Sequence, residues 1–285
     1  MEMSNSVLVK KYSGETEPFS EKKLRQSLVR SGASAQNIQK IIDQMEGHLF
    51  EGITTREIYQ MAFRLLRQSQ RSTAARFSLK KAIMELGPTG FPFEQFIGEI
   101  MKKRGFVVQV GQVLKGKCVT HEVDVVATHD HSHYLMECKF HNQQGKISNV
   151  QVPLYLNSRF EDIRSVWQQL PGNSVKSFQG WVVTNTRFST DAQEYGRCAG
   201  LHLVSWDYPA GNSLREMIEQ SGLFPITAIT LLTIKQKQQL LARDIVLCTQ
   251  LTDQPAALDE LGIASGKKSK ILQEATTLVN TRETN

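Results

Sequence analysis

The sequence predicts a multidomain α+β and α/β protein, with a mostly helical N-terminal domain, a central α/β domain built on a mixed sheet, and a small helical C-terminal domain. Three observations predict this division. A chain of 285 residues is long for one hydrophobic core and suits two or three domains. The Gly87-Pro88 pair ends a helical pattern and marks a boundary. Beyond it, helical periods alternate with short apolar runs that are typical of strands. We therefore expect domains over residues 1–88, 89–213 and 214–285.

The N-terminal domain is predicted to contain one short strand followed by helices, because its apolar residues then recur at helical spacing. Ser20 is well placed to cap the first helix, and Thr54 or Thr55 to cap the third. The expected elements are a strand at residues 7–9, a helix after Ser20, a second helix through 38–49, a third after Thr54 or Thr55, and a last helix over 74–86.

The central domain is predicted to alternate helices with strands. A polar turn at residues 128–132 separates two apolar runs, which favours a hairpin. The expected elements are helices at 93–104, 148–170 and 190–199, and strands at 106–110, 121–127, 134–140, 179–184 and 201–206. From about residue 214 the pattern is helical, with two short repeats of similar character at 240–251 and 258–272.

Composition excludes several classes of protein. The chain has no apolar run near the roughly 18 residues that cross a bilayer, and its first residues lack the layout of a secretory signal. Four scattered cysteines, with no Cys-x-x-Cys pair, argue against a zinc site or a disulfide framework. We therefore expect a cytoplasmic protein with no membrane partner. A formal net charge of +6 leans toward polyanionic partners without establishing one.

The strand predicted at residues 134–140 carries two charges in an apolar setting. Side chains alternate along a strand, so Glu137 and Lys139 share one face. Burying such groups is costly unless another group compensates. The preceding strand places a single acid, Asp124, between valines, and a hairpin would bring Asp124 and Glu137 together. On this pattern alone, a metal site and a buried Glu–Lys ion pair are equally good interpretations.

As a metal site, the two carboxylates would suit a hard divalent cation such as Mg²⁺ or Mn²⁺. The cation would activate a water and neutralise charge in the transition state of phosphodiester hydrolysis. Lys139 would stand beside it, either to stabilise that charge or to orient the nucleophile.

Residues 91–206 resemble the PD-(D/E)XK nucleases, in particular the Mrr-like, type IV restriction endonucleases. Glu137-Cys138-Lys139 matches the (D/E)xK element, and residues 121–126 match the strand that carries the metal-binding aspartate. Glu94, in the opening helix, stands at the position of a frequent extra acid, and Gln151 matches the glutamine of the next helix. Val123 replaces the proline of the family name.

The resemblance implies a DNA-cleaving hydrolase with Asp124 and Glu137 as metal ligands. Its catalytic residues would be Asp124, Glu137, Lys139, Glu94 and Gln151. Glu94 and Gln151 also have plainer interpretations: Glu94 as a favourable charge near a helix N-terminus, and Gln151 as a surface residue.

Histidines near these strands have less specific roles. A regular strand would place His121 on the opposite face from Asp124. His129, His131 and His133 alternate as in a metal clip, but they fall in a predicted hairpin turn, where polar residues are expected. We prefer the turn.

Residues 7–86 resemble the ATP-cone, the small regulatory module of ribonucleotide reductases and of a related transcriptional repressor. The resemblance rests on residues 9–14, 17–20, 23–24, 52–59 and 74–76. It implies that ATP or dATP binds as a regulatory ligand, at the side chains Lys11, Tyr12, Glu17, Lys23, Thr55 and Tyr59.

Two of these positions depart from the family pattern. Tyr12 replaces a usual basic residue, and Tyr59 replaces a frequent histidine. The alternative is that the lysines at 10, 11, 22 and 23 form only a solvated basic face. The sequence has no Walker-type phosphate loop, so we do not expect nucleotide hydrolysis.

The segment from Leu261 to Leu272 resembles the turn of a helix-hairpin-helix motif, with residues 240–251 as a degenerate partner. Such turns offer backbone N–H groups to a DNA phosphate, and nearby lysines add charge. Packing or oligomerisation is the alternative role.

Together these features predict a nucleotide-regulated, magnesium-dependent DNA endonuclease. The alternative is a nucleotide-sensing DNA-binding regulator on an inactive nuclease scaffold. RNA is a weaker candidate substrate, because the sequence shows no aromatic stacking motif of the RNA-binding kinds. Cutting both strands of DNA usually needs two active sites, which favours a homo-oligomer, a dimer or higher.

Overall fold

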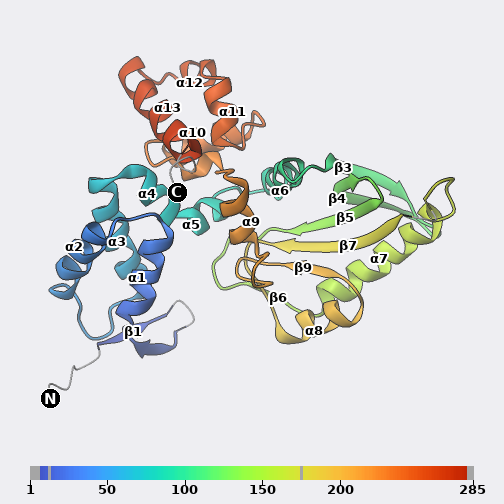
Figure 1. Ribbon diagram of the computed structural model, residues 1–285, viewed down its shortest axis with the longest axis horizontal. Helices are drawn as coiled ribbons and strands as arrows, with labels where there is room; N and C mark the ends of the chain where they lie inside the picture. Colours follow the sequence, from blue (N-terminus) through green and yellow to red (C-terminus); the bar gives the residue numbers. More distant parts are fainter. Residues whose placement is uncertain (1–6, 12–13, 174–175, 281–285) are drawn as a thin grey trace.

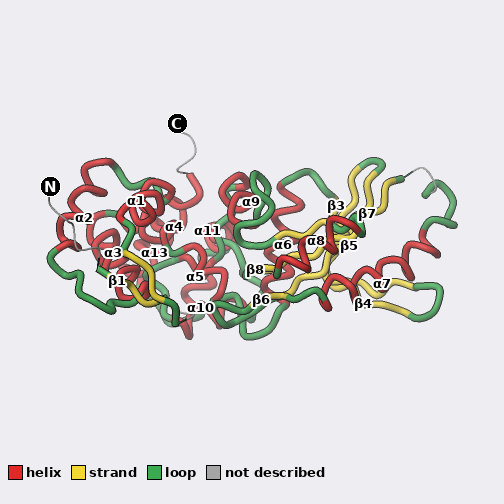
Figure 2. Tube along the Cα trace, turned by 90° about the horizontal axis from the view of Figure 1, so that it is seen from below, coloured by secondary structure: helices red, strands yellow, loops and turns green. Residues whose placement is uncertain are grey.

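The computed structural model describes residues 7–11, 14–173 and 176–280. The chain forms an elongated molecule with a helical N-terminal part at one end and a β-sheet with its helices at the other (Figure 1). The C-terminal helices pack beside the junction of these two parts (Figures 1 and 2). Within the described residues, no helix has both the length and the apolar character that a bilayer span requires.

The N-terminal part is a small helical unit with a two-stranded antiparallel sheet. Ser20 caps its first helix, as predicted, and Thr54 caps the third in a capping box with Glu57. Its elements are β1 (Leu8–Lys10), β2 (Thr16–Pro18), α1 (Glu21–Arg30), α2 (Ala35–Glu46), α3 (Thr55–Ser69), α4 (Arg71–Phe77) and α5 (Leu79–Met84). Apolar faces of α1 to α4 enclose one core.

The single helix predicted over residues 74–86 is wrong. The chain forms two helices there, α4 and α5, separated at Ser78, whose backbone leaves the helical region. The Ser78 hydroxyl donates to the Ala75 carbonyl oxygen (3.1 Å), a local bond that competes with helix continuation. The break lets α5 leave the N-terminal core and pack elsewhere.

The central part is the predicted α/β domain with a mixed sheet. Its five-stranded sheet has the order β3-β4-β5-β7-β9, antiparallel from β3 to β5 and parallel from β5 to β9. Its elements are α6 (Phe91–Lys103), β3 (Val107–Lys115), β4 (Thr120–His129), β5 (Ser132–Lys139), β6 (Ile147–Ser148), α7 (Gln151–Trp167), β7 (Ser177–Thr184), β8 (Arg187–Phe188), α8 (Thr190–Cys198) and β9 (His202–Val204).

Helices cover both faces of this sheet. α6 packs on one face, where Val125 and Met136 are buried, whereas α7 and α8 pack on the other, with Leu135 and Val182. The boundaries that differ most from prediction are those of β3 and α7. β3 runs past residue 110 to Lys115. α7 spans Gln151–Trp167 and not 148–170, and residues 147 and 148 pair with β8.

The C-terminal part is helical, as predicted. Its elements are α9 (Leu214–Ser221), a 3₁₀ turn (Ile226–Ala228), α10 (Ile234–Leu241), α11 (Cys248–Asp253), α12 (Ala256–Asp259) and α13 (Ser265–Asn280). The two similar segments predicted at 240–251 and 258–272 have the same form, the end of one helix, a turn with a positive φ and the start of the next helix. The first of them contains the end of α10, a turn in which Asp244 has a φ of 59°, and the start of α11.

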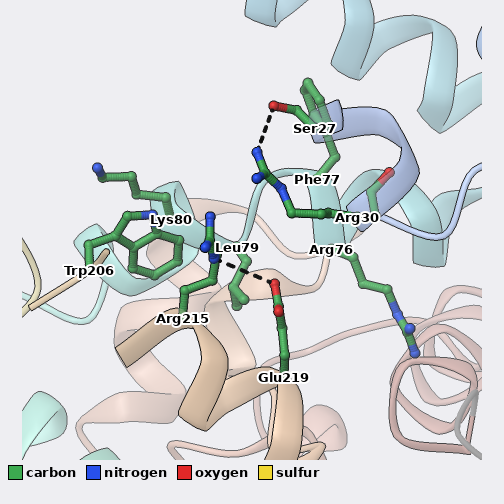
Figure 3. A pocket seen from close by; sticks show the side chains of 10 residues that line it. Ser27, Arg30, Arg76, Phe77, Leu79, Lys80, Trp206, Arg215 and Glu219 are labelled. Carbon is green, nitrogen blue, oxygen red and sulfur yellow. Dashed lines mark hydrogen bonds and ion pairs between the residues drawn. The ribbon is translucent and has the colours of Figure 1, made fainter. Parts of the chain in front are cut away.

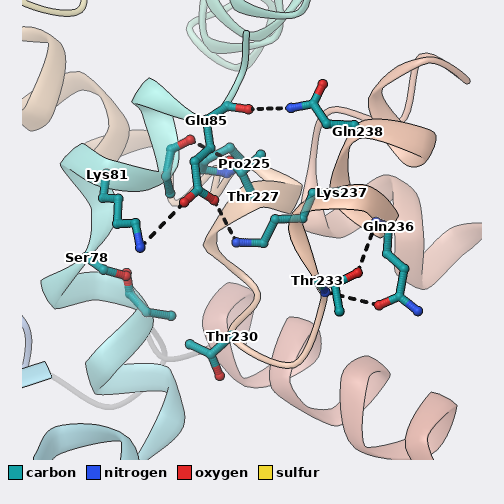
Figure 4. A network of polar contacts seen from close by, with 12 residues as sticks. Ser78, Lys81, Glu85, Pro225, Thr227, Thr230, Thr233, Gln236, Lys237 and Gln238 are labelled. Carbon is teal, nitrogen blue, oxygen red and sulfur yellow. Dashed lines mark hydrogen bonds and ion pairs between the residues drawn. The ribbon is translucent and has the colours of Figure 1, made fainter. Parts of the chain in front are cut away.

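α5 joins the three parts of the chain. Its apolar side chains, including Leu79 and Ile83, belong to one core with α6 and the C-terminal helices. Polar contacts reinforce the junction with α10 (Figure 4). The Lys237 ammonium lies 2.8 Å from the Glu85 carboxylate, and the buried Thr227 hydroxyl donates to the Ala82 carbonyl oxygen at 2.6 Å. The helix that ends the N-terminal part is therefore also a core element of the other two.

Candidate functional site

The β4–β5 hairpin brings Asp124 and Glu137 together, as the sequence predicts. The last paired residues of the hairpin are Val125 and Met136, which directly flank the two acids. The backbone N–H of Cys138 donates to Asp124 Oδ2 at 2.7 Å. The two carboxylates therefore lie on neighbouring strands at one end of the hairpin.

Glu137 is buried, with 3% of its side chain exposed, and holds two cations. One Glu137 oxygen accepts from Lys139 Nζ (2.8 Å), two residues on along the same strand. The other accepts from Arg159 Nη1 (2.9 Å), on α7. The structure therefore contains the buried Glu137–Lys139 ion pair that the strand pattern allowed. It adds a second cation, Arg159, that the pattern did not include.

Arg159 is a site residue that the sequence reasoning missed. Its second guanidinium nitrogen donates to the Glu122 carbonyl oxygen, and its guanidinium carbon lies 5.6 Å from the centre of the Tyr155 ring. One sequence signal exists: Arg159 stands beside Leu156, Phe160 and Ile163, the residues by which α7 packs on the sheet. A cation on the apolar face of a helix generally needs a buried partner.

Several carboxylates lie close enough to Asp124 and Glu137 for their charges to shift one another's pKa values. Burial, followed by the charge of Asp124, raises the pKa of Glu94 to about 7. Burial, followed by the charge of Glu137, raises the pKa of Asp124 to about 6. Glu94 comes from the first turn of α6, so acids from the opening helix and from both strands of the hairpin influence one another.

Gln151 is not brought into this group by any described contact. It is exposed at the first position of α7, and it exchanges hydrogen bonds with Asn149. His121 pairs instead with Asp162 of α7, with 2.8 Å between His121 Nε2 and Asp162 Oδ2. The sequence analysis predicts His121 on the strand face opposite Asp124. In the structure, the side-chain hydrogen bond of His121 is with a residue of α7.

The alternating histidines do not form a metal clip in the described part of the chain. No group of three or more His, Cys, Asp or Glu side chains is arranged there as a ready ligand set. His129 lies beside a hairpin turn in which Asp130 has a φ of 45°, as the turn interpretation predicts. His133 stacks on Trp167, with ring centres 4.6 Å apart.

The N-terminal part gathers a second charged group. Glu17 accepts Lys11 Nζ at 3.0 Å and Lys23 Nζ at 3.1 Å. The Lys10 N–H donates to the Ile53 carbonyl oxygen at 2.9 Å, which holds the end of β1 beside the N-terminus of α3, where Thr55 is exposed. Lys11, Glu17, Lys23 and Thr55 thus come from elements that meet, while Tyr12 lies outside the described residues.

Tyr59 faces the interior of the helical part. Its ring stacks on Phe77 at 5.0 Å and on Phe63 at 6.4 Å between ring centres, and burial raises the pKa of its phenol. Its position is that of a packing residue, deeper than the lysines.

The turn that resembles a helix-hairpin-helix lies between α12 and α13. Gly262 has a φ of 67°, which favours glycine, and the N–H groups of Lys267 and Lys268 already bond to the Ala264 carbonyl oxygen as α13 begins. Lys268 also pairs with Asp259. These two N–H groups and the Lys268 ammonium are engaged within the protein.

Three family models match successive segments of the chain. The model of the ATP cone domain matches residues 7–83, that of a restriction endonuclease matches residues 87–210, and that of the AF1548-like C-terminal domain matches residues 224–279. An uncharacterized protein of Archaeoglobus fulgidus is 29% identical over 180 residues, which cover 63% of this chain and 97% of the relative.

The crystal structure of the protein of unknown function AF1548 is similar as well. It shares 27% sequence identity, has a TM-score of 0.54, and the match covers 67% of this chain and 98% of that chain. Both resemblances seen in the sequence are confirmed by the family models, in the predicted order. The family models therefore find an ATP cone domain over residues 7–83, followed by a restriction endonuclease domain over residues 87–210.

Proposed function

We propose that this protein is a metal-dependent DNA endonuclease whose activity responds to an adenine nucleotide bound by the ATP cone. The observation that carries the proposal is the convergence of Asp124, Glu137 and Lys139 on the β4–β5 hairpin. These residues lie inside the segment that matches the restriction endonuclease model.

The acidic chemistry of the site fits a divalent cation, although within the described residues no group of three or more His, Cys, Asp or Glu side chains is already arranged to hold one. Burial and mutual repulsion raise the pKa values of Glu94 and Asp124, so the site holds more acidic groups than its cations offset. Oxygen ligands of this kind suit Mg²⁺ or Mn²⁺. Asp124 and Glu137 would hold the ion, which when bound supplies an activated water and neutralises charge on the scissile phosphate.

The cations of the site have different tasks. The Lys139 side chain is 35% exposed, so its ammonium is within reach of a DNA phosphate, where it stabilises developing negative charge. The Arg159 side chain is only 15% exposed and holds Glu137 from beneath. Arg159 is therefore a positioning residue: it fixes the carboxylate that would face the metal.

Regulation by nucleotide rests on the ATP cone and on the place of α5. Lys11 and Lys23 offer positive charge to phosphates, next to the exposed start of α3. α5 continues the cone domain into the core shared with the nuclease domain. A nucleotide that binds one arrangement of this junction better than another shifts the population toward it.

A plasmid-cleavage assay tests both parts of the proposal. Wild-type protein and Asp124→Ala are incubated with supercoiled plasmid and Mg²⁺, with and without ATP or dATP. We expect cleavage by the wild type alone, at a rate that changes with nucleotide. Cleavage that survives Asp124→Ala contradicts the assignment of the site, and a rate indifferent to nucleotide contradicts the regulation.

One observation favours a second candidate function, a nucleotide-sensing DNA-binding regulator on an inactive nuclease scaffold. Both oxygens of Glu137 are already engaged, by Lys139 and by Arg159. Such a regulator would bind duplex DNA equally well without metal and leave it intact throughout a Mg²⁺ titration.

A further inference from the structure

A cavity lies where the ATP cone domain meets the nuclease domain, away from both sites described above. It has a volume of about 140 Å³ and is lined by residues of α1, α4, α5 and α9 together with Trp206 (Figure 3). A second cavity, of about 190 Å³, shares Arg30, Arg76 and Glu219 with the first and reaches Leu278 on α13. All three parts of the chain thus contribute to these two adjoining cavities.

The lining is strongly basic. Arg30, Arg76, Lys80 and Arg215 contribute four cations, against the single carboxylate of Glu219. Two of the cations have clear partners. Arg215 lies 3.3 Å from an oxygen of Asp207 and 3.9 Å from one of Glu219. Arg76 donates to the Leu278 carbonyl oxygen at 3.2 Å, and its guanidinium carbon lies 5.2 Å from the centre of the Phe224 ring.

The other two cations have no ion-pair partner among the described residues, although the charge of Asp207 acts on Lys80 from a greater distance. Within the described residues, neither Arg30 nor Lys80 has a carboxylate oxygen within 4.0 Å. Arg30 Nη2 donates to the Ser27 hydroxyl at 3.3 Å, and Lys80 Nζ lies 5.5 Å from the centre of the Trp206 ring. Burial lowers the pKa of Lys80, which shows that its ammonium is partly removed from water. An anion in the cavity would compensate both charges.

The size and chemistry of the cavity indicate the class of anion. Each hollow is smaller than the roughly 300–1,000 Å³ of sites for drug-sized ligands, which favours a small group. Guanidinium forks match the oxygens of a phosphate in paired hydrogen bonds, and an ammonium adds a point charge. A phosphate or diphosphate group meets both conditions.

We propose that this interdomain cavity binds a small phosphoanion, either free or as the phosphate end of a nucleotide. Arg30 and Lys80 are its main contacts, one from the cone domain's first helix and the other from α5. Since the lining of the first cavity comes from the cone, from Trp206 and from α9, the bound anion stabilises the arrangement in which the cavity is formed. The proposal does not depend on nuclease activity, and the cavity is separate from the Lys11–Glu17–Lys23 group.

Isothermal titration calorimetry on the full-length protein tests this site with pyrophosphate as the probe. All variants carry Lys11→Gln and Lys23→Gln, so that the cone lysines do not contribute. Arg30→Gln with Lys80→Gln removes the two unpaired cations. Arg25→Gln with Lys81→Gln is the matched control, because it removes two cations from the same helices, α1 and α5, outside the cavity.

We expect pyrophosphate to bind the parent protein, Arg30→Gln/Lys80→Gln to weaken it at least tenfold, and the control to stay within about twofold. If the first pair reduces folding, Lys80→Gln against Lys81→Gln gives the same comparison. ADP that competes with pyrophosphate and binds more tightly identifies a nucleotide as the source of the phosphate. Pyrophosphate binding that ADP does not displace identifies the free anion.

Three results would overturn the proposal. The first is no pyrophosphate binding to the parent protein. The second is an equal loss in the control pair, which would reflect overall charge. The third is that Arg30→Gln/Lys80→Gln binds pyrophosphate as the parent does but binds a DNA duplex more weakly, which would make these basic residues a DNA contact.

Discussion

Two carboxylates in this molecule are each held by two cations, yet they lie in opposite environments. Glu137 of the nuclease domain accepts Lys139 and Arg159 at 2.8 and 2.9 Å, and 3% of its side chain is exposed. Glu17 of the cone domain accepts Lys11 and Lys23 at 3.0 and 3.1 Å, and 29% of its side chain is exposed. The contact distances are nearly equal, so burial is the variable that separates the two groups.

Burial changes what the pairs do. A buried carboxylate that loses a partner remains in a medium that solvates it poorly, so the loss is strongly destabilising. An exposed carboxylate exchanges its partner for water at little cost. The cations around Glu137 are thus part of the fold, whereas those around Glu17 are available to exchange their carboxylate for a ligand.

The largest effect is expected from Arg159→Met. Glu137 stays buried and loses one of its two cations, so the free energy of unfolding should fall by about 3 kcal/mol. Arg164→Met is the matched control on the same helix, since the ion-pair partner of Arg164 among the described residues is the exposed Glu161 and its other contact is with the Phe178 ring, 5.9 Å from the guanidinium carbon. The control should change stability by less than about 1 kcal/mol. Urea denaturation measures both, and equal small changes would show that burial does not separate these pairs.

An intermediate effect is expected from Lys237→Met. Lys237 and Glu85 are 2.8 Å apart with side chains 12% and 19% exposed, between the two extremes. We expect a loss of about 1–2 kcal/mol, because Glu85 retains some water and the more distant Lys81. Lys235→Met, at an exposed position of the same helix, is the control in the same urea experiment. A loss as large as that of Arg159→Met would contradict the ranking by burial.

The charged residues of Glu137's own strand could be predicted from the sequence, whereas Arg159 could not. Glu137 and Lys139 share a strand face by simple alternation, and a short polar turn was enough to place Asp124 beside them. Arg159 reaches Glu137 only because α7 crosses the sheet in one particular rotation. That rotation follows from the packing of Leu156 and Phe160, which is a property of the whole domain.

In the fold as well, features that depend on neighbouring residues could be predicted, whereas features that depend on distant residues could not. Caps such as Ser20 and Thr54 were predictable, since each bonds within three residues of its own position. The extent of β3 was not, because this edge strand exposes Val107 and Val113 and so lacks a clear apolar pattern. The position of α5 was not predictable either, because its Ala82 carbonyl oxygen accepts from Thr227, more than a hundred residues away in the chain.

A smaller effect, which is lost in acid, is expected from Asp162→Asn. Asp162 accepts His121 and the N–H groups of Cys118 and Val119, and these bonds, the His121 contact first, lower its pKa from 3.8 to about 2. A depressed folded-state pKa contributes stability above the unfolded value, which is lost as pH falls toward the folded value.

The stability difference between wild type and Asp162→Asn should therefore be constant above about pH 5 and shrink from about pH 4 to pH 2. Urea midpoints at each pH provide the measurement. Because both proteins share every other acidic group, their difference isolates Asp162. A difference that does not change with pH would mean that the contacts of Asp162 do not favour its charged form.

The smallest effect on stability is expected from Glu17→Gln, the partly exposed counterpart of the buried Glu137. Lys11 and Lys23 remain solvated when the carboxylate is removed, so the urea midpoint should match that of the wild type. Nucleotide affinity should change instead. Phosphates must displace Glu17 from the lysines, so its removal should tighten ATP binding roughly two- to fivefold, the range that an exposed ion pair allows. Weaker ATP binding in the calorimeter would show that Glu17 contacts the nucleotide itself. In that case Glu17 would be a nucleotide contact that Lys11 and Lys23 hold in place. The exposure of a carboxylate would then not be enough to predict that a ligand displaces it from its lysines.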